Sequence, residues 1–237
     1  MHDRRIDGKT YTFGNQGALY MRAMTWWDHE TQSIWSQPWG VALDGPLKGT
    51  RLDLIPANIV PWSAWLEEHP DTRVLAVDGE FFGVRESFSP NYVIGIALGE
   101  FAKSYPFRTA SQQVVINDRL GPFPVLVLAD AETKAVHTYL RRGGDGELEF
   151  DLRDGQLTDR QTGSIWDVAR GIAVDGPLRG TVLQQVPYIT SYDWAWKTSI
   201  LILRFIKGHD PIGHDPNGRR RDQLSELPSQ ARNRTSP

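Results

Sequence analysis

Short apolar runs alternate with turn-forming residues over most of this chain. Arg51–Ile55 alternates polar and apolar positions, as expected for a strand with one buried face. Tyr92–Leu98 and Ala135–Leu140 are short runs rich in strand-forming residues. The 22 glycines and 15 prolines recur between such runs, so the pattern favours β-structure with turns over a helical bundle. We expect further strands at Tyr11–Phe13, Ala18–Trp27, Val41–Leu43, Thr72–Val77, Phe101–Phe107, Val114–Ile116 and Pro124–Leu128.

A block of 29 residues occurs twice, at Asp28–Pro56 and at Asp159–Pro187. The copies are related by a constant offset of 131 residues without a gap, and 15 of the 29 positions are identical. Chance does not produce such a match, so the chain contains a duplicated structural unit. We expect both copies to follow the same backbone path, with Trp35 and Trp166 buried and each indole N–H hydrogen-bonded.

The order of these blocks predicts a mainly β protein, a β-rich α+β fold of two related units with one or two short helices. The first unit would comprise residues 1–78 and the second residues 92–207, joined by a connector at 79–91. Residues 208–237 hold three consecutive arginines and no apolar periodicity, which predicts a disordered tail. Nothing before Arg4 matches the opening of the second unit, so we expect an incomplete first unit with an exposed apolar face.

Two segments are candidates for helices, and one for a hairpin loop. Trp62–His69 is expected to be a helix because Pro61 can start it and Pro70 stops it. Trp194–Ile206 stays open between helix and strand, since its Ile-Leu-Ile-Leu run is strand-like. Asn117–Gly121 is expected to form the loop of a hairpin.

Composition excludes several kinds of site. The chain has no cysteine, which rules out disulfides, thiolate metal ligands and thiol catalysis. No histidine spacing brings together the ligands of a zinc site, so we expect no metal and no cofactor. A net charge of −3 gives no reason to expect nucleic-acid binding. With no signal sequence and no apolar run long enough to span a bilayer, we expect a soluble cytoplasmic chain, or an extracytoplasmic one if the start is truncated.

Two sets of polar residues are candidates for chemistry. The repeated Asp-x-x-Thr-x-Ser-x-Trp motif could form a polar site, but side-chain capping of a turn explains these residue types without catalysis. In the second unit Glu100, Lys103, Asn117 and Asp118 could form a polar cluster. Glu100 and Asp118 would act as an acid/base pair if they converge, with Asn117 orienting them. The alternative is that these residues form two β-turns.

Tryptophan is concentrated in the first unit. At the constant offset Trp39 faces Arg170, and Trp62 faces Asp193. Core packing explains most such residues, and an aromatic-lined ligand surface is the alternative. Trp26 and Trp27 are adjacent in one expected strand and must point to opposite faces. The candidate binding residues are Trp26, Trp27, Trp39 and Trp62.

The chain resembles a known family in several motifs. These are Gly99-Glu-Phe-Ala-Lys-Ser-Tyr-Pro106, Val115-Ile-Asn-Asp118, Leu157–Trp166 and the two Gly-Pro-Leu-Lys/Arg-Gly-Thr blocks. From Arg4 to Trp196 the chain is similar to the bacterial domain-of-unknown-function family 3179, a (seleno)protein family. The resemblance implies two such units, the first carrying Cys-Pro-Leu-Cys or its selenocysteine form. This chain begins just downstream of where that motif would lie, and Asp130–Thr133, the equivalent stretch of the second unit, holds no sulfur.

The sequence therefore favours a non-catalytic or degenerate member of that family, acting as a binding or structural module. Two alternatives stay open: an enzyme that uses Glu100 and Asp118, and a fragment of a redox-active (seleno)protein whose thiol motif is missing here. An enzyme needs those carboxylates within about 5 Å around a concave pocket. A binding module would instead expose tryptophan, and a partner or a second copy would cover the incomplete first unit.

Overall fold

The computed structural model describes residues 1–21, 23–74 and 89–206. Most of the expected connector, residues 79–91, and the expected tail, residues 208–237, lie outside the described residues. The first unit contains a short hairpin, a four-stranded antiparallel sheet in the order β3-β4-β5-β6, and a helix. Its elements are β1 (Arg5–Ile6), β2 (Lys9–Thr10), β3 (Phe13–Tyr20), β4 (Ala23–Asp28), β5 (Ile34–Ser36), β6 (Val41–Asp44) and α1 (Trp62–Glu68).

The second unit contains a matching four-stranded sheet, β14-β15-β16-β17, and two three-stranded sheets, β18-β7-β8 and β11-β10-β9. Its first elements are β7 (Tyr92–Leu98), β8 (Phe101–Pro106), α2 (Phe107–Gln113), β9 (Val115–Leu120), β10 (Phe123–Ala129) and β11 (Val136–Leu140). The rest are β12 (Arg142–Gly143), β13 (Gly146–Glu147), β14 (Phe150–Arg153), β15 (Gln156–Asp159), β16 (Ile165–Asp167), β17 (Ile172–Asp175), β18 (Tyr188–Tyr192) and α3 (Asp193–Ile206).

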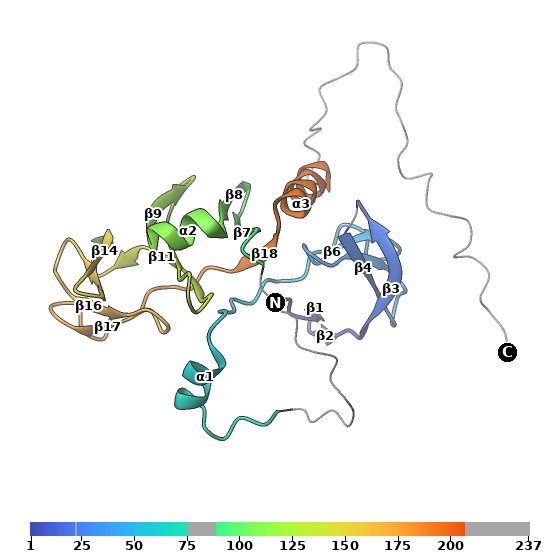
Figure 1. The fold of residues 1–237 in the computed structure, drawn as a ribbon. Helices are drawn as coiled ribbons and strands as arrows, with labels where there is room; N and C mark the ends of the chain where they lie inside the picture. The colour runs from blue at the N-terminus through green and yellow to red at the C-terminus, as the bar shows by residue number, and fades with distance from the viewer. Residues whose placement is uncertain (22, 75–88, 207–237) are drawn as a thin grey trace, which may run out of the picture.

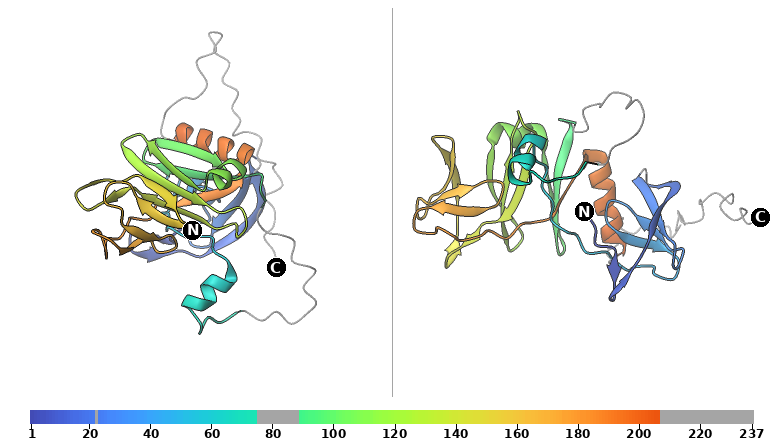
Figure 2. Two further views of the ribbon diagram at one scale, coloured as in Figure 1. Left: turned by 60° about the vertical axis from the view of Figure 1, so that its left-hand side comes forward. Right: turned by 90° about the horizontal axis from the view of Figure 1, so that it is seen from below.

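The two four-stranded sheets lie at opposite ends of the molecule. Figure 1 and the right-hand view of Figure 2 show β7, β18 and α3 between them. Contact with the first unit is made through Trp39 and Val41, which pack against Val93 of β7 and Trp196 of α3. Ile59 also joins the units, since it bridges to Val136 of β11 and its N–H donates to the Tyr188 hydroxyl.

The duplication expected from the sequence is confirmed by strand register. Trp26 pairs with Trp35 in the first unit, as Leu157 pairs with Trp166 in the second. The pairing of β5 with β6 has an irregularity beside Ile34, and β16 with β17 has one at the equivalent place. Both blocks thus follow one backbone path, including the irregularity.

A buried carboxylate organises each copy of the repeat. Asp28 and Asp159 are 0% exposed, and each accepts the indole N–H of the tryptophan seven residues on, at 2.8 Å from Trp35 and 3.0 Å from Trp166. The side chain and backbone N–H of the repeat threonine donate to the same carboxylate. A Cβ at Gly45 would lie 2.7 Å from the Cα of the repeat serine, so only glycine fits the turn that follows. The motif is thus a capped turn under a buried indole.

The second unit has two apolar clusters, one on each face of the β9–β11 sheet. Leu126, Leu128 and Tyr139 from the β9–β11 sheet pack on the four-stranded sheet, where Phe150 is 0% and Trp166 3% exposed. The other face of the β9–β11 sheet packs on β7, β8 and α2 in a separate cluster that includes Ile94, Phe107 and Val127.

Several local predictions are corrected by the structure. Ala18–Trp27 is not one strand, because β3 ends at Tyr20, β4 begins at Ala23, and the two strands pair as a hairpin. Arg51–Ile55 makes only isolated bridges, since its backbone bonds go to the loops around Gly40 and Met1. Thr72–Val74 has no regular structure, and the rest of that expected strand lies outside the described residues. Trp62–Glu68 is helical as expected, although none of its residues is buried.

Three further corrections concern the second unit. Asn117 and Asp118 lie within β9, not in a hairpin loop, because the turn is formed by Gly121 and Pro122. Phe107 starts helix α2 and does not extend the preceding strand, Pro106 being its N-cap. Trp194 lies in helix α3, so the described residues hold three helices where one or two were expected.

We expect Asp159→Ala to lower the free energy of unfolding by about 2–4 kcal/mol. The change leaves the buried indole N–H of Trp166 and the backbone donors of the turn without an acceptor, and each such group costs about 1–3 kcal/mol. Urea unfolding followed by circular dichroism measures it. Asp145→Ala, at an exposed position with no side-chain bond, is the matched control. Equal effects of the two changes would contradict the role given to Asp159.

The same carboxylates predict a loss of stability in acid. Burial alone would raise the pKa of Asp159, but hydrogen bonds from Trp166, Thr162 and Ser164 outweigh it and hold the pKa below its ordinary 3.8. The stabilisation is therefore present above about pH 4 and is lost as the pH falls through the lowered folded-state pKa. Melting temperature measured from pH 6 to pH 2.5 should fall below pH 4, and the slope should be smaller in Asp159→Asn.

Candidate functional site

A group of polar side chains lines a shallow pocket of about 240 Å³ on the second unit. Asp118 on β9 binds Lys103 of β8 at 2.5 Å and accepts the hydroxyl of Tyr105 at 3.0 Å. Thr109 and Gln113 of α2 lie along the same pocket. β8 and β9 belong to different sheets. These residues come together because both sheets and α2 pack in one apolar cluster.

The electrostatics of this group favour one fixed protonation state. Burial tends to raise the pKa of Asp118, but the bonds from Lys103, the Arg119 N–H and Tyr105 outweigh it and lower the pKa below its ordinary value. Burial and the neighbouring Asp118 carboxylate raise the pKa of Tyr105 above its ordinary value. At neutral pH Asp118 is thus an ionised acceptor and Tyr105 a neutral donor, so neither is poised to exchange a proton.

The acid/base pair considered from the sequence is not assembled. Within the part of the chain that the structure describes, Asp118 bonds the side chains of Lys103 and Tyr105 and not that of Glu100. Glu100 is exposed in the turn between β7 and β8. Asn117 is used structurally, because its amide donates to the Phe150 carbonyl and accepts the Phe150 N–H, both at 2.8 Å. Asn117 therefore joins β9 to β14.

The four tryptophans considered for binding lie in different surroundings. Trp39 is 0% exposed and packs on Trp196 with ring centroids 5.3 Å apart, so it cannot line a surface. Trp62 is 51% exposed on α1. Trp27 is half-buried and stacks on His29 at 4.4 Å. Trp26 is half-buried on the opposite face of the sheet, and the tryptophans therefore do not form one aromatic surface.

The structural match between the two units begins at the first residues of the chain. His2 Nε2 lies 2.9 Å from the Gln37 carbonyl, and Tyr139 donates its hydroxyl to the equivalent Val168 carbonyl at 2.8 Å. The Asp3 N–H donates to the Asp53 carbonyl, and the Leu140 N–H donates to the equivalent Gln184 carbonyl. The match between the units therefore extends to His2, two residues further than expected from the sequence. A six-residue difference in the β3–β4 hairpin hides the match when a single offset is applied.

One surface differs between the units. In the second unit Phe150 and Leu157 are 0% and 2% exposed because Leu126 and Leu128 of β10 cover them. The equivalent residues of the first unit, Phe13 and Trp26, are only half-buried, and their cluster contains only residues of that unit. We call this surface the open face: Phe13, Trp26, the backbone of residues 2–4 and the side chain of Arg4. It is the part of the first unit that β9 and β10 cover in the second.

Metal and membrane sites find no support among the described residues. No group of three His, Asp or Glu side chains is placed to hold a metal ion in residues 1–21, 23–74 and 89–206. His137 is 4% exposed, and burial lowers its pKa to about 4, so it is neutral at physiological pH. Within the same ranges no helix combines the length and apolar character needed to cross a bilayer.

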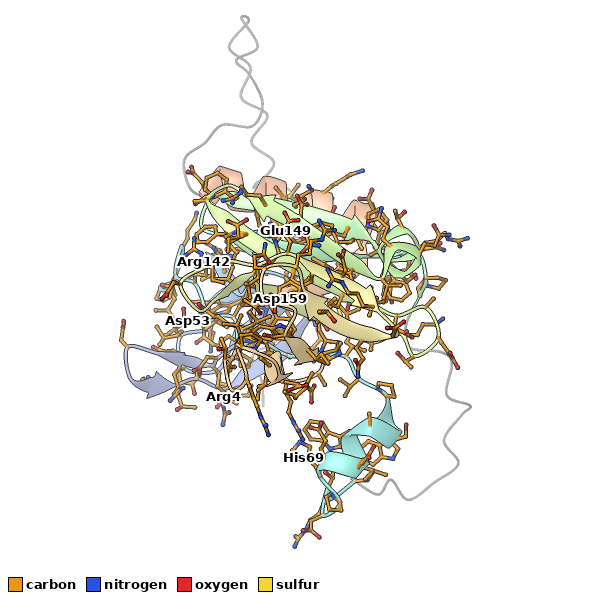
Figure 3. All side chains as sticks on the ribbon, turned by 90° about the vertical axis from the view of Figure 1, so that its left-hand side faces the viewer. Arg4, Asp53, His69, Arg142, Glu149 and Asp159 are labelled. Carbon is orange, nitrogen blue, oxygen red and sulfur yellow. The ribbon has the colours of Figure 1, made fainter. Side chains whose placement is uncertain are left out.

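Sequence reasoning missed Tyr105 and both Arg4 and Arg141. Arg141 is 4% exposed and donates to backbone carbonyls, while Arg4 is exposed at the same position of the first unit. Figure 3 views the molecule with the second unit, which carries Asp159, in front of the first unit, which carries Arg4. Matching the two units with a gap in the β3–β4 hairpin would have aligned these arginines.

We expect Lys103→Ala to raise the pKa of Asp118 toward its ordinary 3.8, because it removes a charged donor. The free energy of unfolding should change by less than about 1 kcal/mol, since the ion pair is partly exposed. A carboxyl-carbon NMR titration measures the pKa. Arg108→Ala removes a nearby exposed positive charge that does not contact Asp118 and is the control. An unchanged pKa in Lys103→Ala would show that the other donors alone hold Asp118 ionised.

Comparison with known proteins identifies a family but not an activity. The model of the family described as protein of unknown function (DUF3179) matches residues 1–86 and again residues 85–200. No curated protein and no solved structure matches the chain. The two matches coincide with the two units seen in the strand register, and together they cover most of the chain. The chain therefore belongs to the DUF3179 family, of which it contains two units.

Proposed function

We propose that this protein is a non-catalytic module that binds a polypeptide at the open face of its first unit. The observation that carries the proposal is the difference between Phe150, which is 0% exposed, and its half-buried equivalent Phe13. The two positions belong to the same repeated sheet, and the second unit covers its copy with β10. An apolar surface that the fold covers in one copy and leaves accessible in the other is suited to binding.

The state of the polar candidates supports a binding role. Asn117 joins two strands, Asp118 holds Lys103 and Tyr105, and the repeated aspartates hold buried indoles. These hydrogen bonds explain why polar residues occupy these positions, without a catalytic role. A proton-transfer role would require a carboxyl whose pKa lies near the working pH, and the pKa values of Asp118 and Asp159 are lowered instead.

An enzyme is the second candidate, because Lys103, Tyr105 and Asp118 converge on one pocket. In that case Asp118 would position Lys103 or Tyr105 against a small substrate held beside α2. The two candidates place their ligands on different units, which makes them separable by experiment.

Selection of a displayed peptide library on the intact protein tests the proposal. Selected peptides should protect the backbone amides of residues 1–13 and of β4 from hydrogen exchange and leave β8 and β9 unchanged. Binding should be equal in Asp118→Asn, because that carboxylate faces β8 in the second unit. The melting temperature of the variant controls for folding.

Three outcomes would contradict this function. Protection of β8, β9 and α2 would place the ligand at the Asp118 pocket. Failure to select any peptide would remove the support for a polypeptide ligand. Hydrolysis of model ester, phosphate or glycoside substrates that is abolished in Asp118→Asn would favour the enzyme.

A further inference from the structure

The Asp118 pocket of the second unit carries hydrogen-bonding side chains that the fold does not use. Thr109 and Gln113 are four residues apart on α2, so they lie on the same side of the helix, along the pocket. Both side chains are exposed, and neither has a hydrogen-bond partner among the residues that the structure describes. Their donors and acceptors are therefore available to a ligand.

The ion pair in the pocket also has donors to spare. Asp118 accepts three hydrogen bonds: from Lys103 at 2.5 Å, from the Tyr105 hydroxyl at 3.0 Å and from the Arg119 backbone N–H at 2.7 Å. Most of the capacity of this carboxylate is thus taken. The Lys103 ammonium has three N–H donors, and its one printed bond goes to Asp118. The pair therefore offers a ligand more donors than acceptors.

The Lys103 ammonium is held in a fixed place while it stays accessible. Asp118 binds it on one side, and it lies 5.5 Å from the centre of the Tyr105 ring. Tyr105 is only 6% exposed, so this ring is itself fixed by packing. The Lys103 side chain is 48% exposed. A charged donor that is already oriented loses less side-chain entropy when it binds a ligand.

The other walls of the pocket are apolar. Pro106, Ala110 and Ile116 line it between α2 and β9. Ala110 is 1% exposed and belongs to the apolar cluster beneath the pocket, and Ile116 packs against that cluster. The volume of about 240 Å³ is below that of pockets for drug-sized molecules, so the pocket suits a body of a few carbon atoms.

The backbone is strained where α2 ends beside the pocket. Val114, which follows Gln113, has φ 63° and ψ −50°, a conformation that β-branched residues rarely adopt. Two backbone bonds hold it there: its N–H donates to the Ala110 carbonyl at 2.8 Å, and its carbonyl accepts the Ala129 N–H at 3.2 Å. Strain that the surrounding structure enforces in this way is concentrated at ligand-binding sites.

We propose that the Asp118 pocket binds a small monocarboxylate with a short aliphatic body. The carboxylate accepts hydrogen bonds from Lys103, Thr109 and Gln113, and the aliphatic body lies against Ala110 and Ile116. Asp118 positions the ammonium and repels a second negative charge on the ligand, which favours one carboxylate over two. This site requires no proton transfer. It lies on the second unit and does not depend on polypeptide binding by the first.

A cationic or a neutral ligand matches the pocket less well. An amine would meet the positive charge of Lys103 and would compete for an Asp118 carboxylate that already accepts three bonds. A neutral amide could use the same donors. It would gain less from them, because hydrogen bonds between two charged partners are stronger.

NMR titration of the intact protein with butyrate, butyramide and succinate tests the proposal. Butyrate and butyramide are nearly equal in size and differ in charge. Butyrate should produce saturable shifts of the Gln113 side-chain amide and of the Thr109 backbone amide. Butyramide and succinate should each bind at least about fivefold more weakly, the first for lack of charge and the second because of Asp118.

Matched variants identify the contacts. Lys103→Ala should weaken butyrate binding by about tenfold or more, because a charged donor is lost. Arg108→Ala removes an exposed positive charge that does not line the pocket and should change binding less than about twofold. Gln113→Ala should weaken binding about threefold or more, whereas Gln112→Ala, an adjacent exposed glutamine outside the pocket lining, should not. The melting temperatures of all four variants should match that of the parent protein.

The proposal is overturned if neither butyrate nor the shorter acetate gives saturable shifts up to about 50 mM. It is also overturned if butyramide binds as tightly as butyrate, or if Lys103→Ala and Arg108→Ala act equally. Shifts that saturate only on the first unit would place the carboxylate elsewhere and would overturn it as well. The peptide selection described above reports on the first unit, so failure of either experiment leaves the other unaffected.

Discussion

A carboxylate withdrawn from water must have its lone pairs occupied by protein donors, and this requirement shapes both units. Asp28 and Asp159 are completely buried, so each needs an indole, a threonine and backbone N–H groups around it. Those donors come from the seven residues that follow, which fixes the turn locally. The serine of the turn then lies against Gly45 or Gly176, where a Cβ cannot fit. The buried aspartate of each copy thus accounts for the threonine, serine, tryptophan and glycine of its turn.

Because that network is local, the repeated sheet forms in the same way whether or not another sheet covers it. The second unit adds Asn117 and Arg141, which attach β9 and β10 through backbone groups outside the repeated block. The first unit keeps the receiving groups, Arg4 and the outward backbone of Phe13, without the strands that would bind them. The duplication has preserved the repeated sheet in both copies, and within the described residues β10 covers only the second.

The sequence predicted what depends on short-range patterns. The capped turns and the buried Trp35 and Trp166 followed from residue types repeated at fixed spacing. The position of Asn117 in a strand did not, because an Asn-Asp pair is typical of turns and only the bond to Phe150 explains it in a strand. Helix α2 was missed because the expected strand Phe101–Phe107 ran through Pro106, whereas proline suits the start of a helix. The Lys103–Asp118 contact joins two sheets, which no local pattern reports.

The excess of tryptophan in the first unit follows from its different surroundings. Trp39 replaces Arg170, which is exposed and pairs with Glu68, because this corner of the first unit is buried against Trp196 of α3. Trp26 replaces Leu157, and its indole reaches His2 at 5.6 Å and Phe13 at 5.9 Å between ring centroids. The larger side chain covers part of the surface that β10 covers in the second unit, which reduces the cost of leaving it open. Both substitutions therefore respond to what lies against the repeated sheet, while the sheet itself stays the same.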